Sequence, residues 1–307
     1  MNIFISKNNE LYMNPYKINN INCFTEYGLK YEPIQIYQLK DIERIKQLDH
    51  LLLYPFTHIN NIWHLIHHLF ICYKFMKKNS LSLTNMYPIF FKNCSLRQGN
   101  LIECTYKTLM YEGMGFSEKN FEELHYIFST NKSIQVNKLY ISNESINFNN
   151  EPLFESFKHH ILNNLQLSYN ETNDNITFIL RRGTREISNI DEVKKKLTNV
   201  QYIYLEDYSI KKQVEIFLNS KIVIGVHGAG LSWLVFMKSG SQLIELYPGN
   251  SNTDNYIRFC NIAKINYKRL CVNITKGNER DFRNATVNIN DEQILSIKKN
   301  IKPNIQA

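Results

Sequence analysis

The sequence predicts an α/β protein with a Rossmann-like domain over its second half. From residue 151 onward, short apolar segments alternate with segments of helical pattern. Turns flank the apolar segments, as they flank buried parallel strands, and this alternation indicates βαβ units around a parallel sheet. A glycine-rich turn, residues 225–230, directly follows one of these strands. We therefore expect the Rossmann-like domain to extend from about residue 160 to the C-terminus.

The second half yields a regular series of elements, and Ser209 has the side chain of a helix N-cap. The last helix is expected to pack on this domain or to cross back to the first half. The predicted helices are 151–167, 191–197, 210–219, 229–237, 253–265 and 291–300, and the predicted strands are 175–183, 200–206, 221–226 and 241–248.

The first half is less regular. An apolar run predicts a buried strand at 51–55, and a helical pattern covers 60–78. Ser117 is a candidate N-cap for a helix that ends near residue 129, and alternation predicts a strand at 134–142.

Composition narrows the function classes. Of 307 residues, 43% are hydrophobic, so the chain can bury a large core. The formal charge of +8 favours anionic partners in general, but no nucleic-acid-binding motif accompanies it, and we expect no nucleic-acid partner. Six cysteines without a CxxC pair indicate free thiols in a reducing compartment. Neither a signal-peptide core nor a membrane-spanning run is evident, so we expect a cytoplasmic or cytosol-like location.

The glycine turn reads Gly225-Val-His227-Gly228-Ala-Gly230. This spacing is neither the dinucleotide fingerprint nor the P-loop. Glycines still allow close approach to the backbone, and the start of the following helix favours an anion. A phosphate or nucleotide site and a tight structural turn both remain open. His227 alone is ambiguous, because histidines in turns often satisfy only a backbone group.

Charged residues accompany two other strand ends. Arg181, Arg182 and Arg185 follow the strand that begins near Ile176, on the carboxyl edge where the glycine turn also lies. Arginine forks match phosphate oxygens, whereas a solvated loop is the alternative. Glu245 ends the next apolar run and is expected to reach the same cleft, where a carboxylate can bind ribose hydroxyls.

The helix at 60–78 carries His64, His67 and His68 on one side and its apolar stripe on the other. Three interpretations compete: a metal site, a solvated polar face, and a cleft-facing set in which one histidine is a general base. A histidine suits proton removal from an alcohol near neutral pH.

Three segments together resemble glycosyltransferase family 61. They are "NIWHLIHHLF", "RRGTREISNIDEV" and "VIGVHGAGLSWLVFMKSGSQLIELYP", in the family's order. The resemblance implies a GT-B fold, in which two Rossmann-like domains face across a cleft. It divides the chain into an N-terminal acceptor-side domain, 1–158, and a C-terminal nucleotide-sugar-binding domain, 159–307.

The resemblance also implies an activity. It predicts an inverting, metal-independent transfer of a sugar, N-acetylglucosamine or xylose, from a UDP-sugar to a hydroxyl of a glycan or glycoconjugate. The donor is a substrate, and no cofactor or metal is expected; the oligomeric state stays open. The implied site residues are a diphosphate set led by Arg182, an N–H cradle, a ribose contact and catalytic histidines: Arg181, Arg182, Arg185, Gly228, Ala229, Gly230, Leu231, Glu245, His64, His67 and His227.

Two departures from the family pattern keep alternatives open. His67 and His68 stand where many members have an acidic residue, which leaves the identity of the base open, and Ser232-Trp233 follows the glycine turn. A catalytically silent nucleotide-sugar or glycan-binding protein is one alternative. An oxidoreductase or other nucleotide enzyme with a non-standard glycine loop is another.

Overall fold

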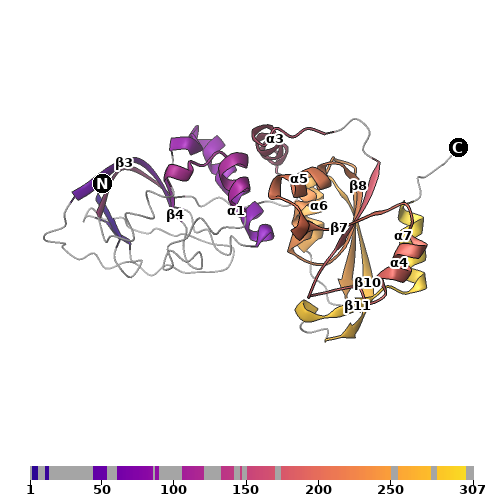
Figure 1. The fold of residues 1–307 in the computed structure, drawn as a ribbon. Helices are drawn as coiled ribbons and strands as arrows, with labels where there is room; N and C mark the ends of the chain where they lie inside the picture. The colour runs from indigo at the N-terminus through magenta and orange to yellow at the C-terminus, as the bar shows by residue number, and fades with distance from the viewer. Residues whose placement is uncertain are drawn as a thin grey trace. The chain divides into compact units, whose positions relative to one another are not determined.

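The computed structural model describes two compact units, Met1–Ile146 and Asn147–Ala307, and each is considered by itself (Figure 1). The predicted division after residue 158 falls inside helix α3, Phe154–Asn164, which belongs to the second unit. The described residues are 2–5, 11–13, 44–53, 61–85, 87–89, 106–120, 133–141, 146, 151–169, 174–249, 255–277 and 282–301.

The described strands of the first unit form one sheet in the order β2-β1-β5-β3-β4. Strands β5, β3 and β4 are parallel, whereas β1 is antiparallel to both of its neighbours. The bounds are β1 Asn2–Ile5, β2 Leu11–Met13, β3 Arg44–Leu53, β4 Tyr87–Ile89 and β5 Ser133–Ile141. The predicted strand 134–142 is confirmed as β5. Of the predicted strand 51–55, residues 51–53 lie in β3, and residues 54 and 55 lie outside the described residues.

Helix α1, Ile62–Asn79, confirms the predicted helix 60–78. The Asn61 side chain caps it by accepting a hydrogen bond from the Trp63 N–H at 3.0 Å. The Ser117 hydroxyl accepts from the Asn120 N–H at 3.3 Å, as an N-cap would; the rest of that predicted helix lies outside the described residues. The described residues of this unit also include a short 3₁₀ turn, η1, at Leu83–Asn85 and a π-helical turn, η4, at Leu109–Gly113. Of the helices described, none is long and apolar enough to cross a membrane.

The second unit is built on a six-stranded sheet, counted over its described residues, in the order β11-β10-β9-β8-β6-β7. All neighbours are parallel except β10 and β11. The bounds are β6 Asn175–Leu180, β7 Gln201–Tyr204, β8 Ser220–Val226, β9 Gln242–Pro248, β10 Asn266–Lys276 and β11 Thr286–Asn288. The predicted α/β class is therefore confirmed.

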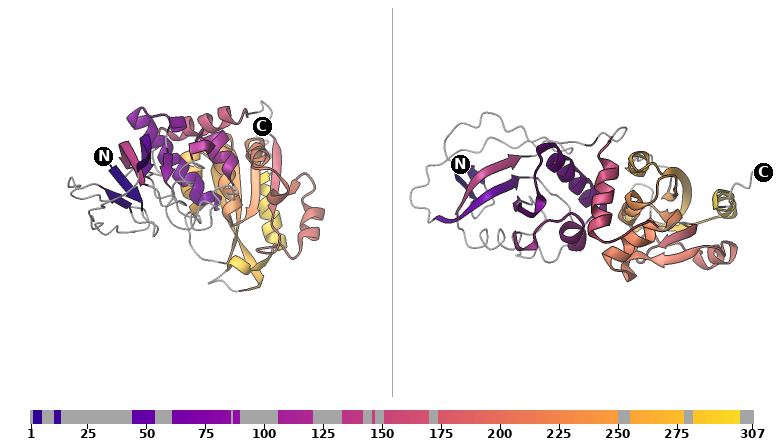
Figure 2. Two further views of the ribbon diagram at one scale, coloured as in Figure 1. Left: turned by 60° about the vertical axis from the view of Figure 1, so that its left-hand side comes forward. Right: turned by 90° about the horizontal axis from the view of Figure 1, so that it is seen from above.

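Helices cover both faces of this sheet, with α5 and α6 on one face and α4 and α7 on the other (Figures 1 and 2). The predicted cap of α5 is confirmed, because the Ser209 hydroxyl accepts from the Lys212 N–H at 3.3 Å. The bounds are α4 Ile190–Lys196, 3₁₀ turn η5 Leu205–Asp207, α5 Ile210–Leu218, 3₁₀ helix η6 Ala229–Phe236, α6 Asn255–Ala263, 3₁₀ turn η7 Phe282–Asn284 and α7 Asp291–Ile301.

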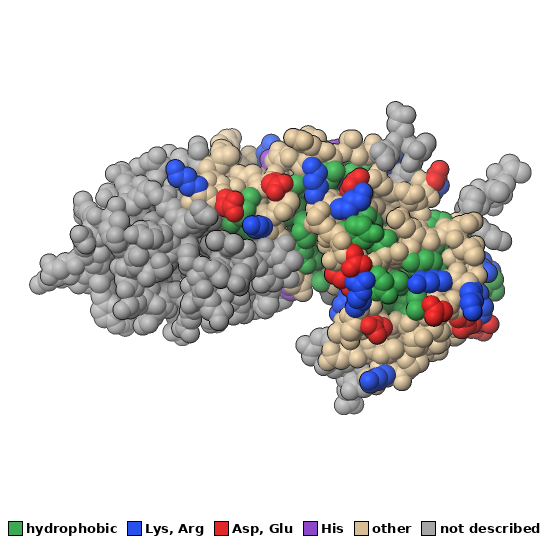
Figure 3. Space-filling model, in the orientation of Figure 1, with side chains coloured by type: hydrophobic (Ala, Val, Ile, Leu, Met, Phe, Trp, Pro, Cys, Tyr) green, Lys and Arg blue, Asp and Glu red, His purple; other side chains and the backbone are tan. Residues whose placement is uncertain are grey.

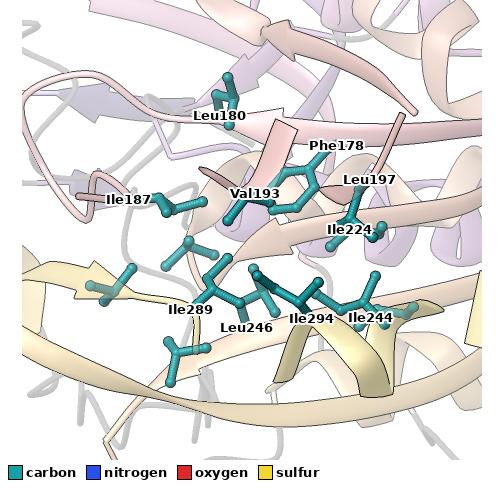
Figure 4. Close-up of a cluster of buried hydrophobic side chains, with 14 of the residues drawn as sticks. Phe178, Leu180, Ile187, Val193, Leu197, Ile224, Ile244, Leu246, Ile289 and Ile294 are labelled. Carbon is teal, nitrogen blue, oxygen red and sulfur yellow. The ribbon is translucent and has the colours of Figure 1, made fainter. Parts of the chain in front are cut away.

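Alternating strand residues divide the core between the two faces. Ile224 and Ile244 point toward α4 and α7, where they pack with Val193 and Ile294 (Figure 4). Since successive side chains of a strand point to opposite faces, Glu245 lies on the face covered by α5 and α6. The closing helix α7 thus packs on the second unit, which is one of the two placements expected from the sequence.

Two features of this unit were not predicted. Strands β10 and β11 add an edge to the sheet where no strand was expected. Residues 229–236 form a 3₁₀ helix rather than the predicted α-helix.

On the face of the described second unit that Figure 3 shows, Lys and Arg side chains are interspersed with Asp and Glu side chains, and charges of one sign do not form a stripe there.

Candidate functional site

The order of the parallel strands marks one place in the second unit. The first strand of the unit, β6, lies between β7 and β8, so the chain runs outward in both directions from the β6–β8 pair. In open α/β sheets ligands bind beyond the carboxyl ends of the strands at such a switch point. Arg181 follows β6 and His227 follows β8. The fold therefore brings the arginine segment and the glycine turn to the same edge.

Two of the three arginines pack against the glycine turn. A Cβ built on Gly228 would lie 2.2 Å from Nη1 of Arg181 and 3.5 Å from the guanidinium carbon of Arg185. A side chain at residue 228 would therefore displace the guanidinium of Arg181. The φ of Gly228, 161°, is extended backbone that any residue adopts, so the effect of a side chain here would be steric.

Arg181 and Arg185 are partly buried cations. Burial lowers the pKa of Arg181. Burial, and after it the charge of Arg181, lower the pKa of Arg185 to about 10. Within the described ranges neither guanidinium makes an ion pair: Arg181 donates to the backbone oxygen and the hydroxyl of Thr184, both at 3.2 Å, and Nε of Arg185 is buried without a hydrogen bond. Two neighbouring cations held this way favour a bound anion.

Arg182 takes a different position in the same turn. Its side chain is 50% exposed, and it donates to both carboxylate oxygens of Asp207, at 2.7 and 2.8 Å. Its guanidinium carbon also lies 3.8 Å from the ring centroid of Tyr204. The predicted leading role of Arg182 in diphosphate binding stays a prediction, and the geometry favours Arg181 and Arg185 for it.

The start of η6 supplies part of the predicted N–H cradle. The Leu231 N–H donates to the Gly228 carbonyl at 2.9 Å, so this group is used inside the turn. The first N–H groups of a helix have no partner within it, which leaves Ala229 and Gly230 as the donors of the cradle. A Cβ on Gly230 would lie 2.9 Å from Leu205, so this glycine also has a packing reason.

His227 is held by a carboxylate. Its Nδ1 lies 2.5 Å from Oε1 of Glu245, and the edges of Tyr247, Tyr256 and Phe282 pack around its ring at centroid distances of 5.0, 5.4 and 5.4 Å. The Tyr256 hydroxyl donates to the Gly228 carbonyl at 2.6 Å. Tyr256 thus contacts both the ring of His227 and the backbone of Gly228, against which Arg181 and Arg185 pack.

Glu245 does not end its strand, as the sequence had suggested. It lies in the middle of β9, opposite Gly225 of β8, and its side chain is 1% exposed. One carboxylate oxygen meets His227 and the other accepts from the Tyr267 hydroxyl. The predicted contact of Glu245 with ribose stays a prediction. The carboxylate is buried beneath His227, and it does not lie at the surface of the candidate site.

The three histidines of α1 do not share one polar face. His67 is buried in the first unit, at 4% exposure, among the apolar residues of the helix, while His64 and His68 are partly exposed. Burial, and after it the charge of His64, lower the pKa of His67 to about 4. The solvated-face interpretation is therefore wrong for His67. Within the described residues, no group of three or more His, Cys, Asp or Glu is arranged to hold a metal ion.

Sequence reasoning missed Tyr256, Tyr267 and Arg269. Arg269 donates from Nε to the Tyr267 hydroxyl at 2.9 Å, and the same Nε lies 3.6 Å from Oε2 of Glu245. Tyr267 and Arg269 lie on the unpredicted strand β10, whose polar residues give no clear alternating pattern around them.

Comparison with known proteins covers this region. The model of the family described as "Glycosyltransferase 61" matches residues 56–244, more than half of the chain. A protein of Drosophila melanogaster named EGF domain-specific O-linked N-acetylglucosamine transferase is 35% identical over 106 residues, which are 32% of this chain and 20% of the fly protein. The protein of that name from Canis lupus familiaris is 28% identical over 185 residues, 55% of this chain and 35% of the dog protein. The matches thus span about a fifth to a third of these relatives.

Proposed function

The chain belongs to glycosyltransferase family 61, and we propose that it transfers a sugar from a UDP-sugar to a hydroxyl group of a glycan or glycoconjugate. We further propose that the second unit binds the nucleotide sugar, that the reaction inverts the anomeric centre, and that the two units form a GT-B cleft. The family supports the reaction class, and the carboxyl edge of the second unit supports the place of the donor.

The observation that carries the proposal is the pair Arg181 and Arg185. Burying part of a cation costs free energy unless a partner compensates for it. Within the described residues neither Arg181 nor Arg185 has an acidic partner in an ion pair. Arg182, which belongs to the same turn, does have one, because it pairs with Asp207 of η5. A diphosphate would supply the missing negative charge, and guanidinium groups bind its oxygens through paired hydrogen bonds.

The proposed chemistry is a single displacement. The acceptor oxygen attacks the anomeric carbon, the bond from that carbon to the diphosphate oxygen breaks, and UDP leaves with the electron pair. Arg181 and Arg185, the N–H groups of Ala229 and Gly230, and His227 face the charge that develops on the leaving group. Fixed positive groups of this kind stabilise the transition state more than the ground state, because the charge on the leaving oxygen grows as the bond breaks. In this proposal the guanidinium groups provide the leaving-group stabilisation without a metal ion, so turnover should persist in excess EDTA.

The acceptor must lose a proton to a base during the displacement. Of the two histidines predicted for this role, His64 is partly exposed whereas His67 is buried with a pKa of about 4. A base needs a pKa near the working pH and access to the acceptor. We therefore assign proton removal to His64 and give His67 a packing role.

The names of the relatives favour one sugar. The matched proteins are named as transferases of N-acetylglucosamine, and we propose this sugar first and xylose second. The acceptor is proposed only as a hydroxyl of a glycan or glycoconjugate.

A thermal-shift panel tests the proposal. UDP, UDP-N-acetylglucosamine and UDP-xylose should raise the melting temperature, because a ligand that binds only the folded state stabilises it. ADP serves as a control of the same charge as UDP, and NAD(P)⁺ tests the oxidoreductase alternative. Stabilisation by NAD(P)⁺ without an effect of UDP would contradict the donor assignment, and donor binding without release of UDP in any acceptor or hydrolysis assay would indicate a silent binding protein.

A further inference from the structure

His227 is the exposed end of a buried hydrogen-bonded chain. Nε of Arg269 donates to the Tyr267 hydroxyl, this hydroxyl donates to Oε2 of Glu245, and Oε1 of Glu245 lies 2.5 Å from Nδ1 of His227. The residues come from three neighbouring elements: β10, β9 and the end of β8. The parallel register that places Glu245 beside Gly225 and Arg269 beside Glu245 builds the chain.

The residues of this hydrogen-bonded chain differ in exposure, and His227 is more exposed than Glu245. The side chain of Glu245 is 1% exposed and that of His227 is 13% exposed. A buried carboxylate needs hydrogen-bond donors and opposite charge close by. The Tyr267 hydroxyl and Nδ1 of His227 are the donors, and the Arg269 guanidinium, 3.6 Å away, is the nearby charge. Both carboxylate oxygens of Glu245 thus make their contacts with side chains of the protein itself.

The contact to Glu245 fixes which ring nitrogen carries a proton. A carboxylate accepts hydrogen bonds, so Nδ1 must be the protonated nitrogen of His227. The rings of Tyr247, Tyr256 and Phe282 pack against the imidazole and prevent it from turning over. Nε2 is then the polar atom of the ring that remains for a ligand, and no hydrogen bond to it is made within the described residues.

We infer that Glu245 is a positioning residue, which orients His227 and fixes its proton on Nδ1 so that Nε2 meets the phosphate groups of the nucleotide-sugar donor. This inference rests on the proposed function and replaces the predicted contact of Glu245 with ribose. When the donor is bound, both ring nitrogens carry protons: Nδ1 donates to Glu245 and Nε2 donates to a phosphate oxygen. The negative charge of Glu245 stabilises this imidazolium, as an orienting carboxylate does in other histidine pairs.

The groups around His227 agree with this protonation. The acidic partner is Glu245, and the nearby cation on β10, Arg269, is itself hydrogen-bonded to Tyr267. Arg181 and Arg185 pack against the adjacent Gly228, and their charges disfavour a further cation on the turn as long as no anion is bound. A bound diphosphate reverses that balance, so donor binding and protonation of Nε2 support each other.

The experiment uses Glu245→Gln, which keeps the shape of the side chain and removes its charge. Two-bond ¹H–¹⁵N spectra of histidine-labelled protein report which nitrogen of His227 is protonated, with His227→Gln to assign the signal. Titration calorimetry with UDP reports affinity. The matched control is Glu215→Gln, which removes a carboxylate paired with Lys212 on the partly exposed surface of α5.

In the parent protein we expect the Nδ1-protonated pattern without ligand. Glu245→Gln should lose this fixed pattern and bind UDP about 10- to 100-fold more weakly, which is the effect of losing a hydrogen bond to a charged group. Tyr267→Phe, which retains Glu245 and removes one of its donors, should weaken UDP binding about three-fold. Glu215→Gln should leave both readouts unchanged.

The inference is overturned if Glu245→Gln keeps the parent's histidine pattern, or if the pattern changes while UDP affinity stays within about two-fold. If Glu245→Gln does not fold, Tyr267→Phe decides: parent-like UDP affinity overturns the inference. Failure of the proposed function gives a separate result, because the parent protein would then not bind UDP at all while the histidine pattern would still report the pairing.

Discussion

The two regions that carry the predicted site residues differ in the protonation of their buried side chains. In α1 of the first unit, His67 is buried among apolar side chains, and burial lowers its pKa to about 4, so it is neutral near pH 7. At the carboxyl edge of the second unit, Arg181 and Arg185 are partly buried yet remain charged, since the lowered pKa of Arg185 is still about 10. A buried histidine can adapt by losing its proton, whereas a buried arginine needs an anion. This difference is why we place His67 in the packing of the first unit and propose Arg181 and Arg185 as the anion-binding pair of the second.

The largest effect is expected in the stability of the first unit at low pH. The pKa of His67 is about 4 in the folded state against the ordinary 6.5. The unfolded chain therefore binds a proton before the folded one as pH falls, and stability is lost between pH 6.5 and 4, by about 3 kcal/mol. His67→Leu should flatten this part of the stability curve, measured by denaturant unfolding between pH 7.5 and 4. His159→Gln, an exposed control, should not; equal slopes in all three proteins would contradict the burial argument.

The second prediction concerns the arginine pair without ligand. Arg185→Met removes a partly buried cation that lies beside Arg181, so the unliganded protein should melt at a higher temperature while UDP affinity falls about 30-fold. Thermal melts with and without UDP measure both effects. A variant that loses stability and keeps its UDP affinity would show that the arginine serves the fold and not the ligand.

Gly228→Ala should come next. The added Cβ would lie 2.2 Å from Nη1 of Arg181, so the guanidinium must move. We expect UDP affinity to fall about ten-fold, while the extended backbone of residue 228 tolerates alanine. A double-mutant cycle makes this specific: in an Arg181→Ala background, Gly228→Ala should have little further effect, because the group it displaces is gone. Additive losses would contradict the steric explanation.

Arg182→Ala should have the smallest effect. Exposed ion pairs such as the one with Asp207 contribute little to stability, and we expect the melting temperature to stay within about 2 °C. Circular dichroism melts at low and at 0.5 M salt check this, since salt screens an exposed pair. A large loss of stability would mean that the Tyr204 and Asp207 contacts hold the whole turn.

Local sequence pattern was sufficient to predict most elements and to bring the candidate site residues to one edge of the sheet. Helix α1 and the Ser209 cap follow from periodicity and from one side chain, and the arginine and glycine turns follow from strand ends in a parallel sheet. Strand β10 was missed because polar residues such as Lys268 and Arg269 interrupt its apolar pattern.

Side-chain direction could not be predicted from the sequence. Arg182 turns outward because Asp207, 25 residues further on, pairs with it. Glu245 meets His227 because of the register between β8 and β9, which no local pattern specifies. The sequence predicted the residues of the candidate site, but it assigned the roles of Arg182 and Glu245 from their positions alone.

The most direct test compares two arginines of one turn. Calorimetric titration with UDP should show that Arg185→Ala binds about 30-fold more weakly than the parent. Arg182→Ala should bind within about two-fold of it. The opposite order, with Arg182→Ala losing UDP and Arg185→Ala retaining it, would contradict the assignment of the partly buried pair as the donor site.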